Sequence, residues 1–122
     1  MEQILLHLFG DFIVQNDWMA MNKKKPGWLG VSACLIHTVL YALPFLLITN
    51  WAAVLVIWST HFIIDRWKLI DYFIMLKNGE KDIKNFGFSH ERPFAISVWI
   101  YIFVDNTFHL IINYLAIKYI VL

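Results

Sequence analysis

Four long apolar stretches constrain what this chain can fold into. They cover about residues 3–21, 29–49, 51–67 and 94–118 and use most of the 122 residues. A bilayer core of about 30 Å needs about 20 apolar residues per helix. Hydrophobic residues make up 60% of the chain and charged residues 16%, with a mean hydropathy of +0.61, outside the usual composition of soluble domains. We therefore predict an all-α integral membrane protein, a four-transmembrane-helix bundle, with residues 1–122 in a single membrane domain.

The cationic side chains predict how these helices are oriented, because short loops rich in Lys and Arg stay in the cytoplasm. Three lysines lie in residues 22–28, and further Lys or Arg residues lie at positions 66, 68, 77, 81, 84 and 92, whereas Lys118 falls on the other side. We expect loops 22–28 and 68–93 to face the cytoplasm and both termini to face outside. The predicted location is the cytoplasmic (inner) membrane, in a multi-pass arrangement.

Ionisable residues recur inside the apolar stretches, although each costs at least about 2.5 kcal/mol at the bilayer centre. The first stretch contains HLFGDFIVQ at 7–15, and the third contains HFIID at 61–65. The second contributes His37, and the fourth contains DNTFH at 105–109. Because residues four positions apart lie on one face of a helix, we expect each helix to turn its polar face toward the other three.

Imidazole and carboxylate side chains together are typical ligands of zinc, manganese or iron. We therefore predict a divalent metal site with the ligands His7, Asp11, His37, His61, Asp65, Asp105 and His109. Four histidines and three aspartates suffice for one metal with an open position or for two neighbouring metals. The candidate catalytic residues are the carboxylates Asp11, Asp65 and Asp105, as ligands or as the base acting on a metal-bound water.

Polar residues toward the predicted cytoplasmic end are candidates for binding a substrate phosphate: Gln15, Arg66, Lys68 and Arg92. Simpler interpretations stay open for several of these positions. The cations can act only as topology determinants, and Gln15 can join helices by hydrogen bonds. Asp65 can form an ion pair with Arg66 and Lys68 at the membrane edge, and His37 can be a core histidine bonded to a carbonyl.

Four motifs in these stretches resemble those of a known family. They are HLFGDFIVQNDWMAMNKKK at 7–25, IHTVLY at 36–41, HFIIDRWK at 61–68 and DNTFHLI at 105–111. They are similar to a bacterial and phage membrane-protein family catalogued as domain of unknown function 3307, with Asn106 in place of the family's usual glutamine. The resemblance implies four membrane helices around a polar centre, without a settled activity. A looser similarity to membrane-bound metal-dependent hydrolases is an analogy only.

The function that we predict is a metal-dependent membrane hydrolase acting on a phosphate ester or a lipid-linked substrate. The same His and Asp column also fits a proton or divalent-cation channel or transporter, which His7 and His109 favour by lengthening it. A small phage or host membrane regulatory protein is the third interpretation. The lipid bilayer is the expected partner, a homo-oligomer is compatible with the small size, and the net charge of +1 gives no case for nucleic acid.

Overall fold

The structure, a computed structural model, describes residues 1–122 and consists of helices and their connections, so the predicted all-α class is confirmed. The α-helices are α1 (Glu2–Leu8), α2 (Asp17–Asn22), α3 (Gly27–Ala42), α4 (Trp51–Arg66), α5 (Leu69–Asn78) and α6 (Phe94–Tyr119). A π-helical segment, η1 (Phe9–Val14), continues α1. Two 3₁₀ segments, η2 (Leu43–Leu47) and η3 (Lys84–Gly87), follow α3 and α5.

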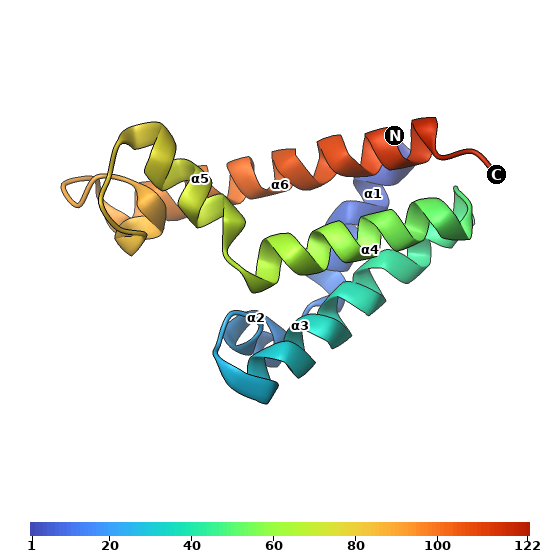
Figure 1. The fold of residues 1–122 in the computed structure, drawn as a ribbon, viewed down its shortest axis with the longest axis horizontal. Coiled ribbons are helices and arrows are strands. Elements are labelled where there is room, and N and C mark those ends of the chain that lie inside the picture. Colours follow the sequence, from blue (N-terminus) through green and yellow to red (C-terminus); the bar gives the residue numbers. More distant parts are fainter.

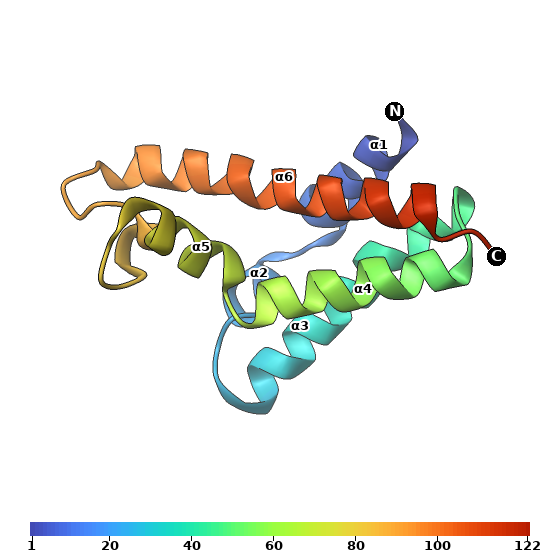
Figure 2. The ribbon, with the colours of Figure 1, turned by 45° about the horizontal axis from the view of Figure 1, so that its top comes forward.

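Four segments surround a common interior. Helix α6 runs the length of the molecule, α4 lies beside it, and α3 packs against the other side of α4 (Figure 1). Helix α1 and segment η1 complete the enclosure, because α1 contacts α6 and η1 contacts α3 (Figure 2). Helix α5 and segment η3 pack on each other beside the start of α6, and both chain termini lie at its other end.

The prediction of one continuous helix over residues 3–21 is wrong. The backbone becomes extended at Gln15, with φ −65° and ψ 119°, and Asn16 then caps α2 by accepting a hydrogen bond from the Met19 backbone N–H at 2.9 Å. The helical part before this break, residues 2–14, is about 20 Å long at about 1.5 Å per residue. Asparagine is a favoured N-cap residue, so Asn16 is the sequence signal for the break.

The stretches expected at 29–49, 51–67 and 94–118 coincide with α3 plus η2, with α4, and with α6. Two helices are long and apolar enough to cross a membrane: Gly27–Leu47, with mean hydropathy 1.8, and Phe94–Tyr119, with mean hydropathy 1.6. The segment expected as loop 68–93 instead contains α5 and η3. Helix α5 has ten residues, and Gly79 caps its C-terminal end with a left-handed backbone (φ 68°).

The start of α4 is tied to the end of α6, which holds these two helices in register. The Asn50 side chain accepts hydrogen bonds from the backbone N–H groups of Ala52 and Ala53, both at 3.0 Å. Its amide nitrogen donates to the Ile120 carbonyl at 2.7 Å. Asn50 therefore caps one helix and fastens it to the other.

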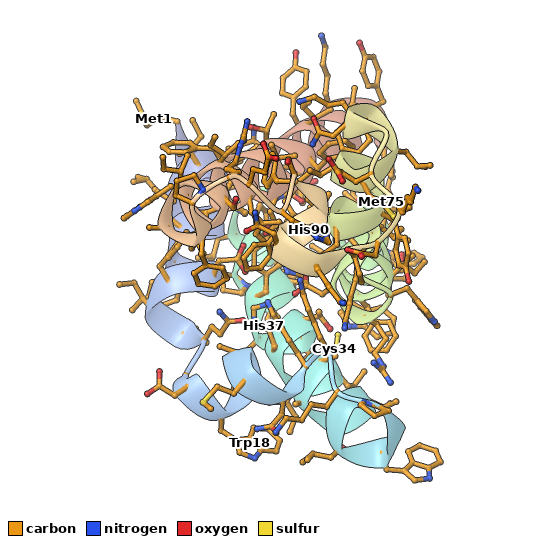
Figure 3. All side chains as sticks on the ribbon, turned by 90° about the vertical axis from the view of Figure 1, so that its left-hand side faces the viewer. Met1, Trp18, Cys34, His37, Met75 and His90 are labelled. Carbon is orange, nitrogen blue, oxygen red and sulfur yellow. The ribbon has the colours of Figure 1, made fainter.

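The interior has a polar part and an apolar part, while many large apolar side chains lie outside. The apolar part, here called the apolar cluster, consists of Tyr41, Ala42, Phe45, Ala53, Val54, Ile57 and Ala116. Buried polar residues of the four segments that surround the interior are His7, His37, Thr38, His61, Asp65, Ser97, His109 and Asn113. Figure 3 shows His37 in the middle of the molecule and Met1 and Trp18 at its edges. Buried ionisable side chains and many exposed large apolar ones are both uncommon in a soluble domain.

Candidate metal centre

Segment η1 brings Asp11 into the interior. It is π-helical, a conformation that is rare and frequent at functional sites. Gly10 allows η1 to approach α3 closely, because a Cβ atom there would lie 2.5 Å from Tyr41 Cδ2 and 3.2 Å from Tyr41 Cα. This close approach places the Asp11 carboxylate opposite the histidines of α3 and α4.

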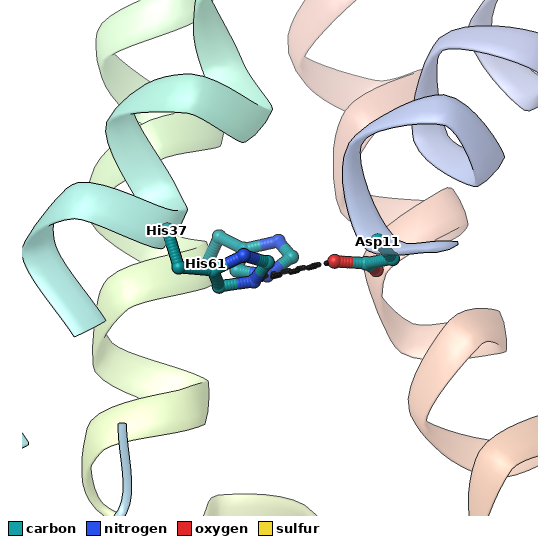
Figure 4. A group of neighbouring side chains, drawn as sticks. All are labelled: Asp11, His37 and His61. Atoms are coloured by element: carbon teal, nitrogen blue, oxygen red, sulfur yellow. Dashed lines mark hydrogen bonds and ion pairs between the residues drawn. The ribbon is translucent and has the colours of Figure 1, made fainter. Parts of the chain in front are cut away.

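Asp11, His37 and His61 form a compact group of donor atoms, here called the donor triad. The two imidazole rings project from neighbouring helices toward the Asp11 carboxylate (Figure 4). The Nε2 atoms of the two histidines are 3.2 Å apart, and Asp11 Oδ1 lies 3.3 Å from His37 Nε2 and 3.5 Å from His61 Nε2. Donors at about 2.0–2.1 Å from a tetrahedral metal ion are about 3.3–3.4 Å from each other. The donor triad therefore has the spacing of one face of such a tetrahedron.

Among the three atoms of the donor triad, hydrogen bonds leave Asp11 Oδ1 unsatisfied, and the far ring nitrogens of the two histidines are also unpaired. Asp11 Oδ1 is buried without a hydrogen-bond partner, and so are the Nδ1 atoms of His37 and His61. Each buried polar atom left unpaired costs about 1–3 kcal/mol. Asp11 Oδ1 faces the Nε2 atoms of both histidines, so a cation bound among these three atoms would supply the interaction that this oxygen lacks.

Asp65 connects the donor triad to His109. Its Oδ2 atom lies 3.4 Å from both His37 Nε2 and His61 Nε2, and its Oδ1 atom lies 3.6 Å from His109 Nε2. His109 Nε2 is buried, has no hydrogen bond, and lies 3.5 Å from Asp105 Oδ1. The rings of His61 and His109 stack with centroids 3.9 Å apart. Donor atoms of His61, Asp65 and His109 lie within 4.8 Å of one another, so these residues form a second candidate group of ligands.

His7 differs from the other predicted ligands because both of its ring nitrogens already have partners. Its Nδ1 atom is 2.7 Å from the Tyr41 hydroxyl, and its Nε2 atom is 2.5 Å from Asn106 Oδ1. Asn113 donates its amide to the same hydroxyl at 2.6 Å, so Tyr41 donates its proton to His7. With Asp11 Oδ2 at 3.6 Å from Nδ1, His7 flanks the donor triad and has no free nitrogen for a metal.

Lys23 belongs to the centre, although its place in a run of three lysines predicts only a role in membrane topology. Its ammonium group donates to Asp65 Oδ2 at 2.6 Å and lies 3.5 Å from His37 Nε2. Burial opposes the charge on this ammonium, but the carboxylates of Asp65 and Asp11 outweigh it and raise the pKa of Lys23 above its ordinary value. Nothing distinguishes Lys23 in the sequence from the two lysines after it; the fold selects it through the break at Gln15.

Two further polar residues of the centre continue a spacing that the sequence displays. Tyr41 follows His37 by four positions, and Asn113 follows His109 by four positions. Residues at this spacing share a helix face. Extending the rule from histidine and aspartate to tyrosine and asparagine would have identified both.

A cavity of about 220 Å³ adjoins the centre. Its walls are Asp11, Phe12, Gln15, Lys23, Ile102, Asp105 and Asn106. Two predicted ligands and one predicted substrate-binding residue therefore face it together with Lys23. The side chain of Gln15 has a buried, unpartnered Oε1 atom, so this cavity wall also offers an unused acceptor.

The three cations expected to hold a substrate phosphate do not reach this cavity. Lys68 lines a different cavity, and the Arg92 guanidinium lies over the Phe88 ring, 4.4 Å from its centroid. Arg66 forms neither a hydrogen bond nor an ion pair through its side chain. Asp65 pairs with Lys23 and not with Arg66 or Lys68.

A family model described as "Protein of unknown function (DUF3307)" matches residues 1–121. The chain belongs to this family. The match confirms the resemblance carried by the polar motifs of the sequence. No curated protein and no solved structure matches the chain.

Proposed function

We propose that this DUF3307 protein is a membrane-embedded, metal-dependent hydrolase that acts on a phosphate ester or a lipid-linked substrate. The donor triad carries the proposal: three buried atoms from η1, α3 and α4 are 3.2–3.5 Å apart, and one of them, Asp11 Oδ1, lacks a hydrogen bond. Two imidazoles and a carboxylate suit zinc, manganese or iron. Catalytic sites of this kind hold the ion with three protein ligands and keep another position for water.

The distribution of apolar surface supports the membrane part of the proposal. Only 11% of the most apolar window of α6 is buried, which supports a lipid-facing helix over a core helix of a soluble protein. Exposed residues along it include Phe94, Trp99, Phe103, Ile111 and Leu115. We further propose that α1–η1 and α4 lie in the membrane beside α3 and α6, with the lysine-rich connections in the cytoplasm and both termini outside. Because α4 is only about 24 Å long, the bilayer thins locally around it.

The carboxylates around the donor triad supply the groups that hydrolysis needs. A divalent ion lowers the pKa of a bound water to about 7. Asp65 lies within 3.4 Å of two triad nitrogens, and Asp105 faces the same cavity as Asp11. If an ion held a water at the triad, Asp65 would be within reach of its proton, and Asp105 would be the alternative base on the cavity wall.

We propose that Lys23 binds the substrate phosphate, the role that the sequence predicts for Arg66, Lys68 and Arg92. Its ammonium group is the cation that faces the cavity, where Gln15 and Asn106 provide further polar contacts. An ammonium beside a metal site neutralises the negative charge that develops on phosphate oxygens during hydrolysis. The proposed substrate phosphate therefore lies in this cavity, next to both Asp11 and Lys23.

The compactness of the centre favours hydrolysis over transport. The rings of His61 and His109 are in contact, and His7 lies 6.1 Å from His109 between ring centroids, so the histidines form one group and not a column. Toward the chain termini the apolar cluster fills the interior, with Tyr41, Phe45 and Ile57 fully buried. A continuous polar path is interrupted there. All donors come from one chain, so the centre does not require a second copy.

The test is hydrolysis of bis(4-nitrophenyl) phosphate and of phosphatidic acid by the full chain, purified in detergent and loaded with zinc, manganese or iron. We expect activity that a chelator removes, and that Lys23→Met lowers by at least about tenfold while the metal stays bound. Lys25→Met is the matched control, since Lys25 is an exposed neighbour in the same run. Metal-loaded protein that hydrolyses neither compound but conducts cations in liposomes would establish the transport alternative.

A further inference from the structure

A second cavity lies where α5, η3 and the start of α6 meet. Its volume is about 380 Å³, and its walls are Lys24, Lys68, Asp71, Ile83, Lys84, Asn85, Phe86 and Phe94. We call it the lysine cavity. Its three lysines come from three places in the sequence: the turn before α3, the junction of α4 and α5, and η3. It shares no wall residue with the cavity beside the metal centre.

Strained backbone is concentrated in the walls of the lysine cavity. The non-glycine residues of the chain with positive φ are Lys68 (53°), Asn85 (52°) and Phe86 (58°), and all of them line this cavity. A left-handed backbone costs about 1–2 kcal/mol for such residues. It persists where the surrounding structure imposes it, and such residues gather at ligand sites.

The packing beneath the cavity holds this strained segment in place. Gly87, with φ 82°, follows it directly, and a Cβ atom there would lie 2.5 Å from both the Asp71 carbonyl oxygen and the Met75 nitrogen. Only glycine allows this contact between η3 and α5. The Asn85 side chain donates to the carbonyls of Ser89 and Arg92 at 2.8 and 3.0 Å, which fixes the loop above it.

The charge of the lysine cavity is positive. Lys24 is held by the Tyr101 hydroxyl at 2.5 Å and by Asp71 Oδ2 at 3.4 Å. The ammonium groups of Lys68 and Lys84 form no ion pair, so one carboxylate faces three cations. Two unpaired lysines in a concave, partly aromatic site provide the electrostatic recognition that a phosphate group needs.

We propose that the lysine cavity binds a phosphate anion of the kind carried by an anionic phospholipid headgroup. Phe86 and Phe94, with ring centroids 5.7 Å apart, form an apolar wall next to the lysines, which suits the glycerol and acyl part of a lipid. Basic pockets at the cytoplasmic ends of membrane helices bind such headgroups. The proposal rests on the membrane placement given above and is independent of the metal centre.

Native mass spectrometry of the full chain in detergent tests the proposal by counting bound lipids. We expect phosphatidylglycerol to bind at least about tenfold more tightly than phosphatidylcholine, and the Lys68→Gln/Lys84→Gln variant to lose this preference. Lys77→Gln/Lys81→Gln is the matched control, because both side chains are exposed, lie in the same region and change the charge equally. This control should stay within about twofold of the unmodified chain. The single variant Lys84→Gln, at an exposed position, covers the case in which the double variant does not fold.

A parallel titration with inorganic phosphate distinguishes the two sources of the anion. Competition with phosphatidylglycerol that depends on Lys68 and Lys84 identifies a free phosphate or phosphate ester, whereas its absence identifies the lipid headgroup. Equal losses in the two double variants, or no preference for phosphatidylglycerol together with no effect of phosphate, would overturn the proposal. Metal content measured on the same samples reports separately on the metal centre, so failure of one proposal is not mistaken for failure of the other.

Discussion

The apolar cluster and the metal centre share helices α3, α4 and α6 but have opposite effects on the stability of the fold. In the apolar cluster, Ala42, Ala53 and Ala116 let helices α3, α4 and α6 approach closely around Phe45 and Ile57. In the metal centre, the next turns of those helices place buried imidazoles and carboxylates, and several atoms of the centre lack hydrogen bonds. Close apolar packing stabilises a fold, whereas unpaired buried polar atoms destabilise it. The apolar cluster therefore stabilises the fold, and this stability offsets the free-energy cost of the unpaired polar atoms that function requires in the centre.

The largest expected effect on stability comes from truncation in the apolar cluster. Phe45→Ala removes a fully buried ring and leaves a cavity, which should lower the free energy of unfolding by about 3–5 kcal/mol. Unfolding followed by circular dichroism in detergent measures this loss. Protein that remains folded should bind as much metal as the unmodified chain. Loss of metal from folded Phe45→Ala would show that the two parts are not separate.

Gly10→Ala should affect both parts, because Gly10 sets the distance between η1 and α3. The added methyl group would collide with Tyr41, so η1 must move away and take Asp11 with it. We expect a loss of about 1–3 kcal/mol in unfolding free energy, together with weaker metal binding in a competition titration. Ile13→Ala, at an exposed position on the same segment, is the control and should change neither. Normal metal affinity in Gly10→Ala would contradict the assignment of Asp11 as a metal ligand.

Tyr41→Phe tests the hydroxyl group that links the apolar cluster to the polar residues of the metal centre. That hydroxyl bonds to His7 and accepts from Asn113, so its removal leaves two buried polar partners unpaired. Stability should fall by about 1–2 kcal/mol, and metal affinity by about tenfold, because His7 no longer holds its orientation beside Asp11. Tyr114→Phe, which removes an exposed hydroxyl bonded to Lys118, is the control. An equal effect of the two substitutions would contradict the role of this network.

The smallest expected effect lies outside both parts, in the exposed pair of Asp82 and His90. The His90 imidazole lies 3.0 Å from Asp82 Oδ1 and lowers the pKa of this carboxyl. A lowered pKa stabilises the fold above the ordinary aspartate value of about 3.9 and ceases to do so as the pH falls through the lowered value. The stability difference between the unmodified chain and Asp82→Asn should therefore be small near pH 5 and disappear as the pH falls through the lowered pKa. A difference that grows on acidification would have the wrong sign for this pair.

The sequence predicts the helical class and the main members of the centre because both follow from local periodicity. Apolar stretches of helix length and polar residues four positions apart are visible without a structure, and Asp11, His37, His61 and Asp65 do come together. The position of Lys23 is not visible in this way. It depends on the direction that the chain takes after the break at Gln15, which is set by packing between α2 and α3.

The segment after α4 shows a second limit of sequence reasoning. Its charges indicate a loop, but α5 forms within it because Ile70 and Ile74 pack against Ile64 and Phe88. Contacts between residues distant in sequence decide that outcome, and they also bring Lys24 beside Lys68 and Lys84. The lysine cavity is therefore a property of the fold and not of any motif.

Metal analysis tests the central claim most directly. Inductively coupled plasma mass spectrometry is applied to the full chain, purified without a histidine tag or chelator, and to His61→Gln, with Asp82→Asn as an exposed control. We predict about one or two equivalents of zinc, manganese or iron in the unmodified chain and in the control, and a loss of most of it in folded His61→Gln. No metal in the unmodified chain after incubation with each ion, or the same content in His61→Gln, would contradict the account.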